Sequence, residues 1–131
     1  MESHKLNRLK SLLSELDTQN IAYVSWKNNH QLPSVMSGNG DLDLLVPNDS
    51  KDKFIEVCKV KGWIETINPV AKFPHVKHFY RLGENNEIYH IHVYFKLITG
   101  ETWLKEFYLP FDIWLLENRV WNSNLEVWVA N

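Results

Sequence analysis

The sequence has little of what marks a secreted or membrane-bound protein. Cys58 is the single cysteine among 131 residues, which excludes an intrachain disulfide and favours a reducing compartment. The polar, periodic N-terminus does not have the form of a signal peptide. No apolar stretch approaches the roughly 20 residues that a membrane-spanning helix needs. We therefore expect a cytoplasmic protein without a membrane partner.

Charge of one sign is also scarce. Fourteen Lys and Arg residues stand against 16 Asp and Glu residues, and the net charge of −2 gives no broad basic surface for nucleic acid. The hydrophobic and charged fractions, 44% and 23%, are typical of a soluble globular protein. We predict one domain over residues 1–131. The apolar ending LEVWVAN leads us to expect that the natural chain continues beyond Asn131 or pairs with another module.

Hydrophobic periodicity predicts an α+β domain on a mixed sheet with flanking helices. Helices are expected over residues 3–18, 50–61 and 111–119, with a short helical turn at 101–106. Strands are expected over residues 21–26, 41–46 and 63–67, in a hairpin of 78–83 with 87–97, and over 125–130. Loops are expected over residues 27–40 and 68–77, and a turn at 122–124.

Two acids open the second predicted strand. Asp41 and Asp43 are two positions apart, so they point to the same face with Cα atoms about 7 Å apart. Leu42 and Leu44 point to the opposite face. A divalent cation between the carboxylates would turn their repulsion into binding, and carboxylate oxygens suit Mg²⁺ or Mn²⁺. Such a pair typically positions metal ions against a nucleoside triphosphate. The alternative is a solvated strand start whose acids cap nearby backbone N–H groups.

The order of acids and apolar residues separates this motif from other Asp-x-Asp chemistries. In phosphatases that form an aspartyl-phosphate, the motif follows the strand and a Thr comes two residues later, where this chain has Leu45. In metal-dependent glycosyltransferases the motif also usually ends an apolar strand. Here the apolar strand follows the acids, so neither chemistry is favoured.

Three short motifs of the sequence together resemble those of a known family. Gly40-Asp41-Leu42-Asp43-Leu44-Leu45-Val46 is similar to the acidic strand of the nucleotidyltransferase fold shared with DNA polymerase beta. The closest likeness is to uncharacterised bacterial nucleotidyltransferase-like proteins. In these proteins a Leu-Lys-Gly-like signature ends the first strand, and Ser25-Trp26-Lys27 stands there. A later strand carries Asp-x-His, and His90-Ile91-His92 stands there.

The resemblance implies nucleotide binding with Asp41 and Asp43 as metal ligands and Lys27 near the phosphates. It also implies a third carboxylate on a neighbouring strand, which ligates metal and helps activate the attacking hydroxyl, but His90 holds that position. Asn28 replaces the Gly after Lys27, and the Gly-Ser pair of the wider fold is absent at the start of the loop. On this reading Asp41, Asp43 and His90 are the catalytic residues. The predicted substrate-binding residues are Ser25, Lys27, Ser37, Gly38, Gly40 and His92.

The two histidines share a face of their predicted strand. His90 and His92 are about 7 Å apart by strand rise, on the face opposite Ile91 and Val93. If this strand neighbours the acidic strand, four side chains line one patch, and a mixed Asp/His set favours Mn²⁺, Zn²⁺ or Fe over Mg²⁺. His90 can alternatively act as a neutral general base. The other interpretation is that both are partly buried histidines bonded to neighbours, or face solvent.

Three functional hypotheses follow. The first is a metal-dependent nucleotidyltransferase that uses Mg²⁺ or Mn²⁺ to move a nucleotidyl group from a nucleoside triphosphate to a hydroxyl-type acceptor. The second is a catalytically inactive nucleotide-binding or interaction module of the same fold. The third is a metal-dependent phosphoester enzyme with a mixed Asp/His site. The sequence indicates neither the acceptor, the preferred base nor the oligomeric state.

Overall fold

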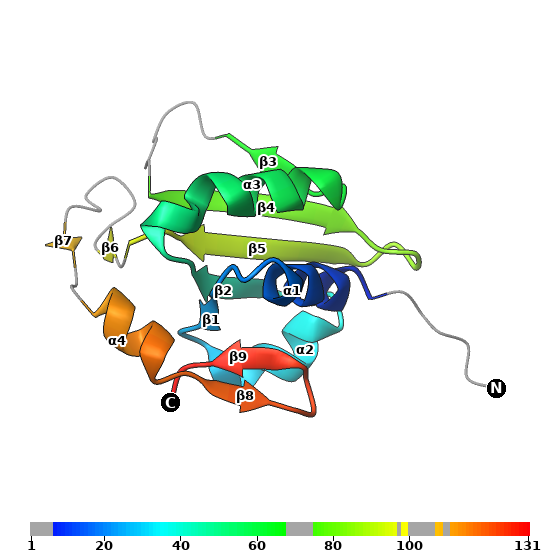
Figure 1. The fold of residues 1–131 in the computed structure, drawn as a ribbon. Helices are drawn as coiled ribbons and strands as arrows, with labels where there is room; N and C mark the ends of the chain where they lie inside the picture. Colours follow the sequence, from blue (N-terminus) through cyan, green and yellow to red (C-terminus); the bar gives the residue numbers. More distant parts are fainter. Residues whose placement is uncertain (1–6, 68–74, 97, 100–106, 109–110) are drawn as a thin grey trace.

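The computed structural model describes residues 7–67, 75–96, 98–99, 107–108 and 111–131. Its centre is a mixed seven-stranded sheet with helices, so the predicted α+β class is confirmed (Figure 1). The helices are α1 (Arg8–Thr18), α2 (Leu32–Met36), α3 (Lys51–Val60) and α4 (Asp112–Glu117), with 3-10 turns η1 (Asn29–Gln31) and η2 (Asn48–Ser50). The strands are β1 (Val24–Ser25), β2 (Asp41–Leu45), β3 (Ile64–Thr66), β4 (Val76–Leu82), β5 (Ile88–Tyr94), β6 (Ile98–Thr99), β7 (Phe107–Tyr108), β8 (Val120–Asn122) and β9 (Val127–Val129).

The acidic strand β2 lies at the centre of the sheet. The strand order is β3-β4-β5-β2-β1-β9-β8, while β6 and β7 form a separate pair. β2 pairs in parallel with β5 on one side and antiparallel with β1 on the other. β4 and β5 form the predicted antiparallel hairpin. A central strand has both edges hydrogen-bonded, so the backbone that carries the two acids is held on both sides.

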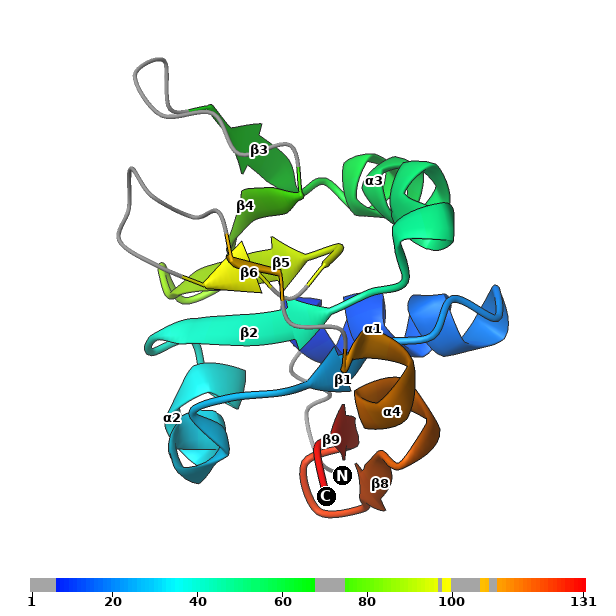
Figure 2. The ribbon, with the colours of Figure 1, turned by 90° about the vertical axis from the view of Figure 1, so that its left-hand side faces the viewer.

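Helices α1 and α3 cover one face of the sheet (Figures 1 and 2). The apolar stripe of α1 is buried, as its leucine spacing predicts, and α3 adds Phe54, which packs edge-on against Phe79 and Phe95. The residues of β2 and β5 that point to this face, Leu42, Leu44, Ile91 and Val93, belong to the same core. A smaller cluster on the opposite face joins Val24, Leu45 and Tyr94 to Leu115 and Leu116 of α4.

Several predicted boundaries were wrong. The expected strand 21–26 is reduced to β1 (Val24–Ser25), and the expected loop 27–40 contains η1 and α2. Pro33 stands in the first turn of α2, where a missing N–H costs no intrahelical bond. The loop expected to run to residue 77 ends earlier, because β4 begins at Val76.

The two ends of the chain also differ from expectation. α1 begins at Arg8, where the Asn7 side chain accepts hydrogen bonds from the N–H groups of Leu9 and Lys10. Near the C-terminus β8 pairs with β9 in a hairpin, where only a turn and one strand were expected. The helical turn expected at 101–106 lies outside the described residues. Among the described residues, no helix combines the length and apolar character that crossing a bilayer requires.

Candidate functional site

The parallel register of β2 and β5 brings the predicted site residues side by side. Asp41 lies opposite His90, and Asp43 lies opposite His92. Because side chains alternate along a strand, all four point to the face that α1 and α3 do not cover. The mixed Asp/His patch was predicted on the condition that these two strands are neighbours, and this condition is confirmed.

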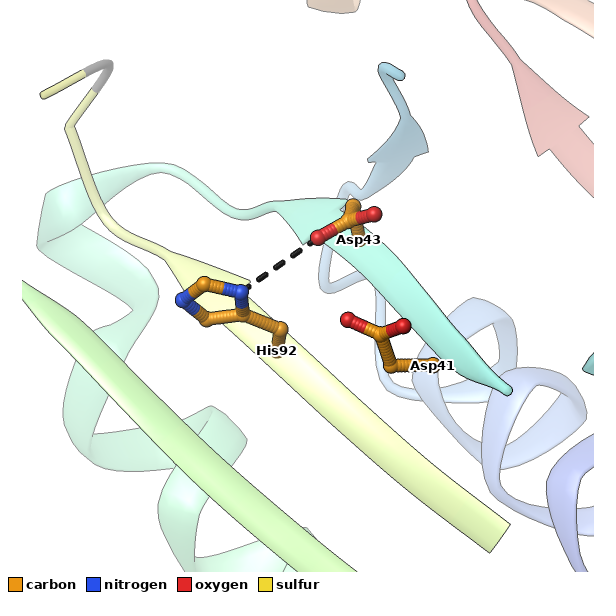
Figure 3. A group of neighbouring side chains, drawn as sticks. All are labelled: Asp41, Asp43 and His92. Carbon is orange, nitrogen blue, oxygen red and sulfur yellow. Dashed lines mark ion pairs between the residues drawn. The ribbon is translucent and has the colours of Figure 1, made fainter. Parts of the chain in front are cut away.

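Three of the four side chains converge. Asp41, Asp43 and His92 each offer one ligand atom, and these atoms all lie within 4.8 Å of one another (Figure 3). The Nδ1 atom of His92 is 3.4 Å from Oδ1 of Asp43. Asp43 is buried with 2% of its surface exposed, whereas Asp41 at the start of β2 is half-buried. The set is open to solvent on the Asp41 side and buried on the Asp43 side.

Asp43 is surrounded by groups that favour its ionised form. Burial alone would raise the pKa of its carboxyl group, but hydrogen bonds from His92 and Asn28 and the charge of Lys27 outweigh burial and lower it. Asn28 donates from Nδ2 to Oδ2 of Asp43 at 3.1 Å, and Nζ of Lys27 lies 3.9 Å from Oδ1. Asp43 is therefore a carboxylate at neutral pH, the form that binds a cation.

Lys27 is held at the edge of this set. Its ammonium group donates to the Tyr94 hydroxyl at 2.9 Å and lies 5.0 Å and 4.9 Å from the ring centres of Trp26 and Tyr94. The side chain keeps 38% of its surface exposed. Lys27 thus stays accessible to an anionic ligand while its position is fixed, which agrees with its predicted place near the acidic pair.

His90 lies outside the converging set, although it faces Asp41 across β2 and β5. Its Nε2 atom lies 2.9 Å from Nδ1 of His78, and its ring stacks on Tyr80 with centroids 4.2 Å apart. His78 also stacks on His92 at 4.1 Å. Burial and the neighbouring imidazoles lower the pKa of His78 to about 4, and burial first of all lowers that of His90. The four-residue patch is thus divided, with His92 beside the acids and His90 beside His78.

The other predicted binding residues shape the loops around the site. The Oγ of buried Ser25 donates to Oδ1 of Asn29 at 2.6 Å, and Ser37 Oγ donates to the Pro33 carbonyl at 3.0 Å. Gly38 faces Glu87, and a Cβ there would lie 2.7 Å from that residue's Cβ. Gly40 has φ +109° at the residue before Asp41, a conformation that favours glycine. Substrate contacts for these four residues remain a prediction.

Sequence reasoning overlooked Asn28 as a residue of the site. Its φ is +58°, in the left-handed region where Asn is better tolerated than most residues. The Leu-Lys-Gly-like signature that the sequence resembles has Gly at this position, and Gly adopts the same conformation freely. The presence of Asn in place of Gly at this position could therefore have indicated a site residue. Asn keeps the backbone conformation and adds an amide that contacts Asp43.

The residues present fit a divalent metal ion. Two carboxylates, one of them held ionised, and one imidazole are all established ligand types. The nitrogen of His92 that is turned toward Asp43 is Nδ1, whereas Nε2 lies on the far side of the ring (Figure 3). The donor set and its charge are those of a cation site.

Comparison with known proteins supports the fold. No family model matches the sequence, and no curated protein matches it. Among solved structures, the chain is similar to the lincomycin-bound crystal structure of the lincosamide antibiotic adenylyltransferase LnuA. The TM-score is 0.55 at 10% sequence identity, over 95% of this chain and 78% of that chain. At this identity the similarity concerns the fold alone. The protein with the similar fold is named as an adenylyltransferase.

Proposed function

We propose that this protein is a metal-dependent nucleotidyltransferase, which moves a nucleotidyl group from a nucleoside triphosphate to a hydroxyl group of an acceptor. The observation that carries the proposal is the convergence of Asp41, Asp43 and His92 on adjacent parallel strands, in a fold similar to that of an adenylyltransferase. Fold similarity alone carries no activity. The acids at the start of a central strand are the feature that connects this fold to phosphate chemistry.

The proposed roles follow from position. Asp41 and Asp43 hold a divalent ion, Mg²⁺ or Mn²⁺, against the triphosphate. When bound, that ion neutralises charge on the phosphates and helps orient them. Lys27 uses one N–H to bond Tyr94, which leaves further donors of its ammonium group for phosphate oxygens.

The transfer itself is an in-line displacement. The acceptor hydroxyl oxygen forms a bond to the α-phosphorus, the bond from that phosphorus to the oxygen bridging the β-phosphate breaks, and pyrophosphate leaves with the electron pair. The hydroxyl proton needs a base. We assign it to His90, because this residue lies opposite Asp41 in the register of β2 and β5 and burial lowers its pKa, which favours the neutral form. When Nε2 of His90 donates to Nδ1 of His78, Nδ1 of His90 is unprotonated and accepts a proton.

Pyrophosphate release tests the proposal. The purified protein is incubated with Mg²⁺ or Mn²⁺, each nucleoside triphosphate and a panel of hydroxyl-bearing small molecules. Lincomycin is the first acceptor to try, because it is bound in the similar LnuA structure. We expect release that requires metal, nucleotide and acceptor together, with a product whose mass increases by one nucleotidyl group.

Two variants give the experiment its control. Asp43→Asn removes the charge of a buried site acid, whereas Asp49→Asn removes that of an exposed acid on η2. Release lost in Asp43→Asn and kept in Asp49→Asn supports the proposal. Release that survives in Asp43→Asn contradicts it. Nucleotide binding without release from any acceptor indicates the inactive binding module instead.

A further inference from the structure

Resting on the proposed metal-dependent function, we infer that His92 is the third protein ligand of the metal and that this imidazole makes the site select Mn²⁺ over Mg²⁺. The family that the sequence resembles places a carboxylate in the third position. The selectivity for Mn²⁺ is thus inferred from His92 of this chain and not from that family. It concerns the binding of the ion alone, before any nucleotide is present.

The geometry favours His92 as the ligand. It lies directly opposite Asp43 in the parallel register, and its ring belongs to the set whose ligand atoms lie within 4.8 Å of one another. Only 14% of the side chain is exposed. The ring is held between His78, at a centroid distance of 4.1 Å, and Tyr94, at 4.4 Å. An imidazole fixed in this way loses little conformational freedom when it binds a metal ion.

The neighbouring histidine, His90, contacts His78 and Tyr80. Nε2 of His90 lies at hydrogen-bond distance from Nδ1 of His78, and its ring is nearly parallel to that of Tyr80, with 9° between the planes. Within the described residues, the converging set contains His92 and not His90. Of the two histidines on β5, His92 is the one placed for coordination.

Ligand chemistry then determines the ion. Mg²⁺ prefers oxygen ligands in near-ideal octahedral geometry and gives up its waters reluctantly. Imidazole suits transition metals, and carboxylates suit Mg²⁺, Ca²⁺ and Mn²⁺. Mn²⁺ meets both preferences better than Mg²⁺, since it accepts the nitrogen of His92 as well as the oxygens of Asp41 and Asp43. A third carboxylate in place of the imidazole would reduce the advantage over Mg²⁺.

Calorimetric titration of the metal-free full chain with MnCl₂ and MgCl₂, without nucleotide, tests this selectivity. We expect Mn²⁺ to bind more tightly than Mg²⁺ by about tenfold or more, which is a difference of about 1.4 kcal/mol in binding free energy. His92→Asp gives an all-oxygen set and brings the two affinities closer together. His30→Gln, which removes an exposed histidine outside the site, leaves their ratio unchanged. Equal affinities in the wild type, or an unchanged ratio in His92→Asp, would overturn the inference.

Pulsed electron paramagnetic resonance of bound Mn²⁺ detects a coordinated nitrogen directly in the wild-type protein. We expect coupling to ¹⁴N in the wild type and in His30→Gln, and its loss in His92→Asp. Coupling that is absent in the wild type, or that disappears in His90→Gln and persists in His92→Asp, refutes the assignment to His92. The titration and the resonance measurement are independent of the proposed transfer. A protein that binds Mn²⁺ through His92 but never releases pyrophosphate would contradict only the transfer proposal.

Discussion

At the scale of single residues, Asn28 combines two properties that are usually considered separately. Its backbone adopts φ +58°, and its side chain donates to the carboxylate of Asp43 at 3.1 Å. Asp43 has two oxygens, and the amide occupies Oδ2 while Oδ1 faces Lys27 and His92. Asn28 is thus a positioning residue, which keeps one oxygen of Asp43 turned toward the candidate metal.

Two substitutions separate these properties. Asn28→Gly removes the amide and also the Cβ, whereas Asn28→Ala removes the amide but keeps a Cβ in the left-handed region, which costs about 1–2 kcal/mol relative to Gly. We expect both variants to bind Mn²⁺ more weakly than the wild type, and only Asn28→Ala to lose that amount of unfolding free energy relative to Asn28→Gly. Urea unfolding and metal titration measure the two effects. Equal stability of the Gly and Ala variants would contradict the backbone argument.

At the scale of elements, one face of β2 contributes to the candidate site and the other to the core. Asp41 and Asp43 point toward the candidate site, while Leu42 and Leu44 are buried in the core with 1% and 0% of their surface exposed. The alternation of a strand assigns these faces, and a shift of one residue would exchange them. The buried leucines therefore fix the register that places the acids.

This assignment predicts a large stability cost on the buried face. Leu42→Ala removes a core side chain, and we expect the free energy of unfolding to fall by about 2–5 kcal/mol. Ile64→Ala on edge strand β3 removes a side chain that is 69% exposed, and we expect a change within about 0.5 kcal/mol. Denaturant unfolding of both variants provides the comparison. A Leu42→Ala cost as small as that of Ile64→Ala would show that β2 is not anchored as described.

Local signals explain which elements were predictable. The hairpin of β4 and β5 was predicted because two alternating segments flank a short polar turn, and the α1 helix because its leucines recur at helical spacing. α2 was missed because Asn, Gly, Ser and Pro in its neighbourhood indicate a loop. β8 was missed because only its pairing with β9 distinguishes it from a turn.

At the scale of the whole molecule, the histidine cluster couples stability to pH. His78 on β4 faces His90 and His92 from β5 and the acids Asp41 and Asp43 from β2, and burial first of all lowers its pKa from 6.5 to about 4. Between these two values the unfolded chain carries a proton on His78 that the folded protein does not bind. Stability therefore falls as pH falls through this window. The pKa of His90 is lowered in the same direction. The contribution of Asp43 is lost below its ordinary value of 3.8, outside this window.

The pH dependence can be isolated with one variant. In the presence of a chelator, we expect a lower free energy of unfolding at pH 5 than at pH 7. His78→Gln removes the group responsible for part of the difference, so its stability should change less between the two pH values. Urea unfolding at both pH values measures this. If the two proteins show the same difference, His78 does not supply the effect.

The candidate site was predictable in composition and not in arrangement. The spacing of Asp41 and Asp43 placed them on one face, and the alternation of β5 did the same for His90 and His92. Which histidine joins the acids depends on the register between β2 and β5 and on the hydrogen bond between His78 and His90. That bond joins two strands of the folded sheet, so the pattern of β5 alone does not reveal it. Asn28 contacts Asp43 for a similar reason, through the left-handed turn after Lys27.

The central claim is that Asp41 and Asp43 hold a metal ion against a nucleoside triphosphate. Its most direct test is calorimetric binding of a non-hydrolysable nucleoside triphosphate analogue in the presence of Mn²⁺, compared between the wild type and Asp41→Asn/Asp43→Asn. The account predicts saturable, metal-dependent binding to the wild type and no measurable binding to the variant, with both proteins folded by circular dichroism. Equal affinity of the two proteins for the nucleotide would contradict the account.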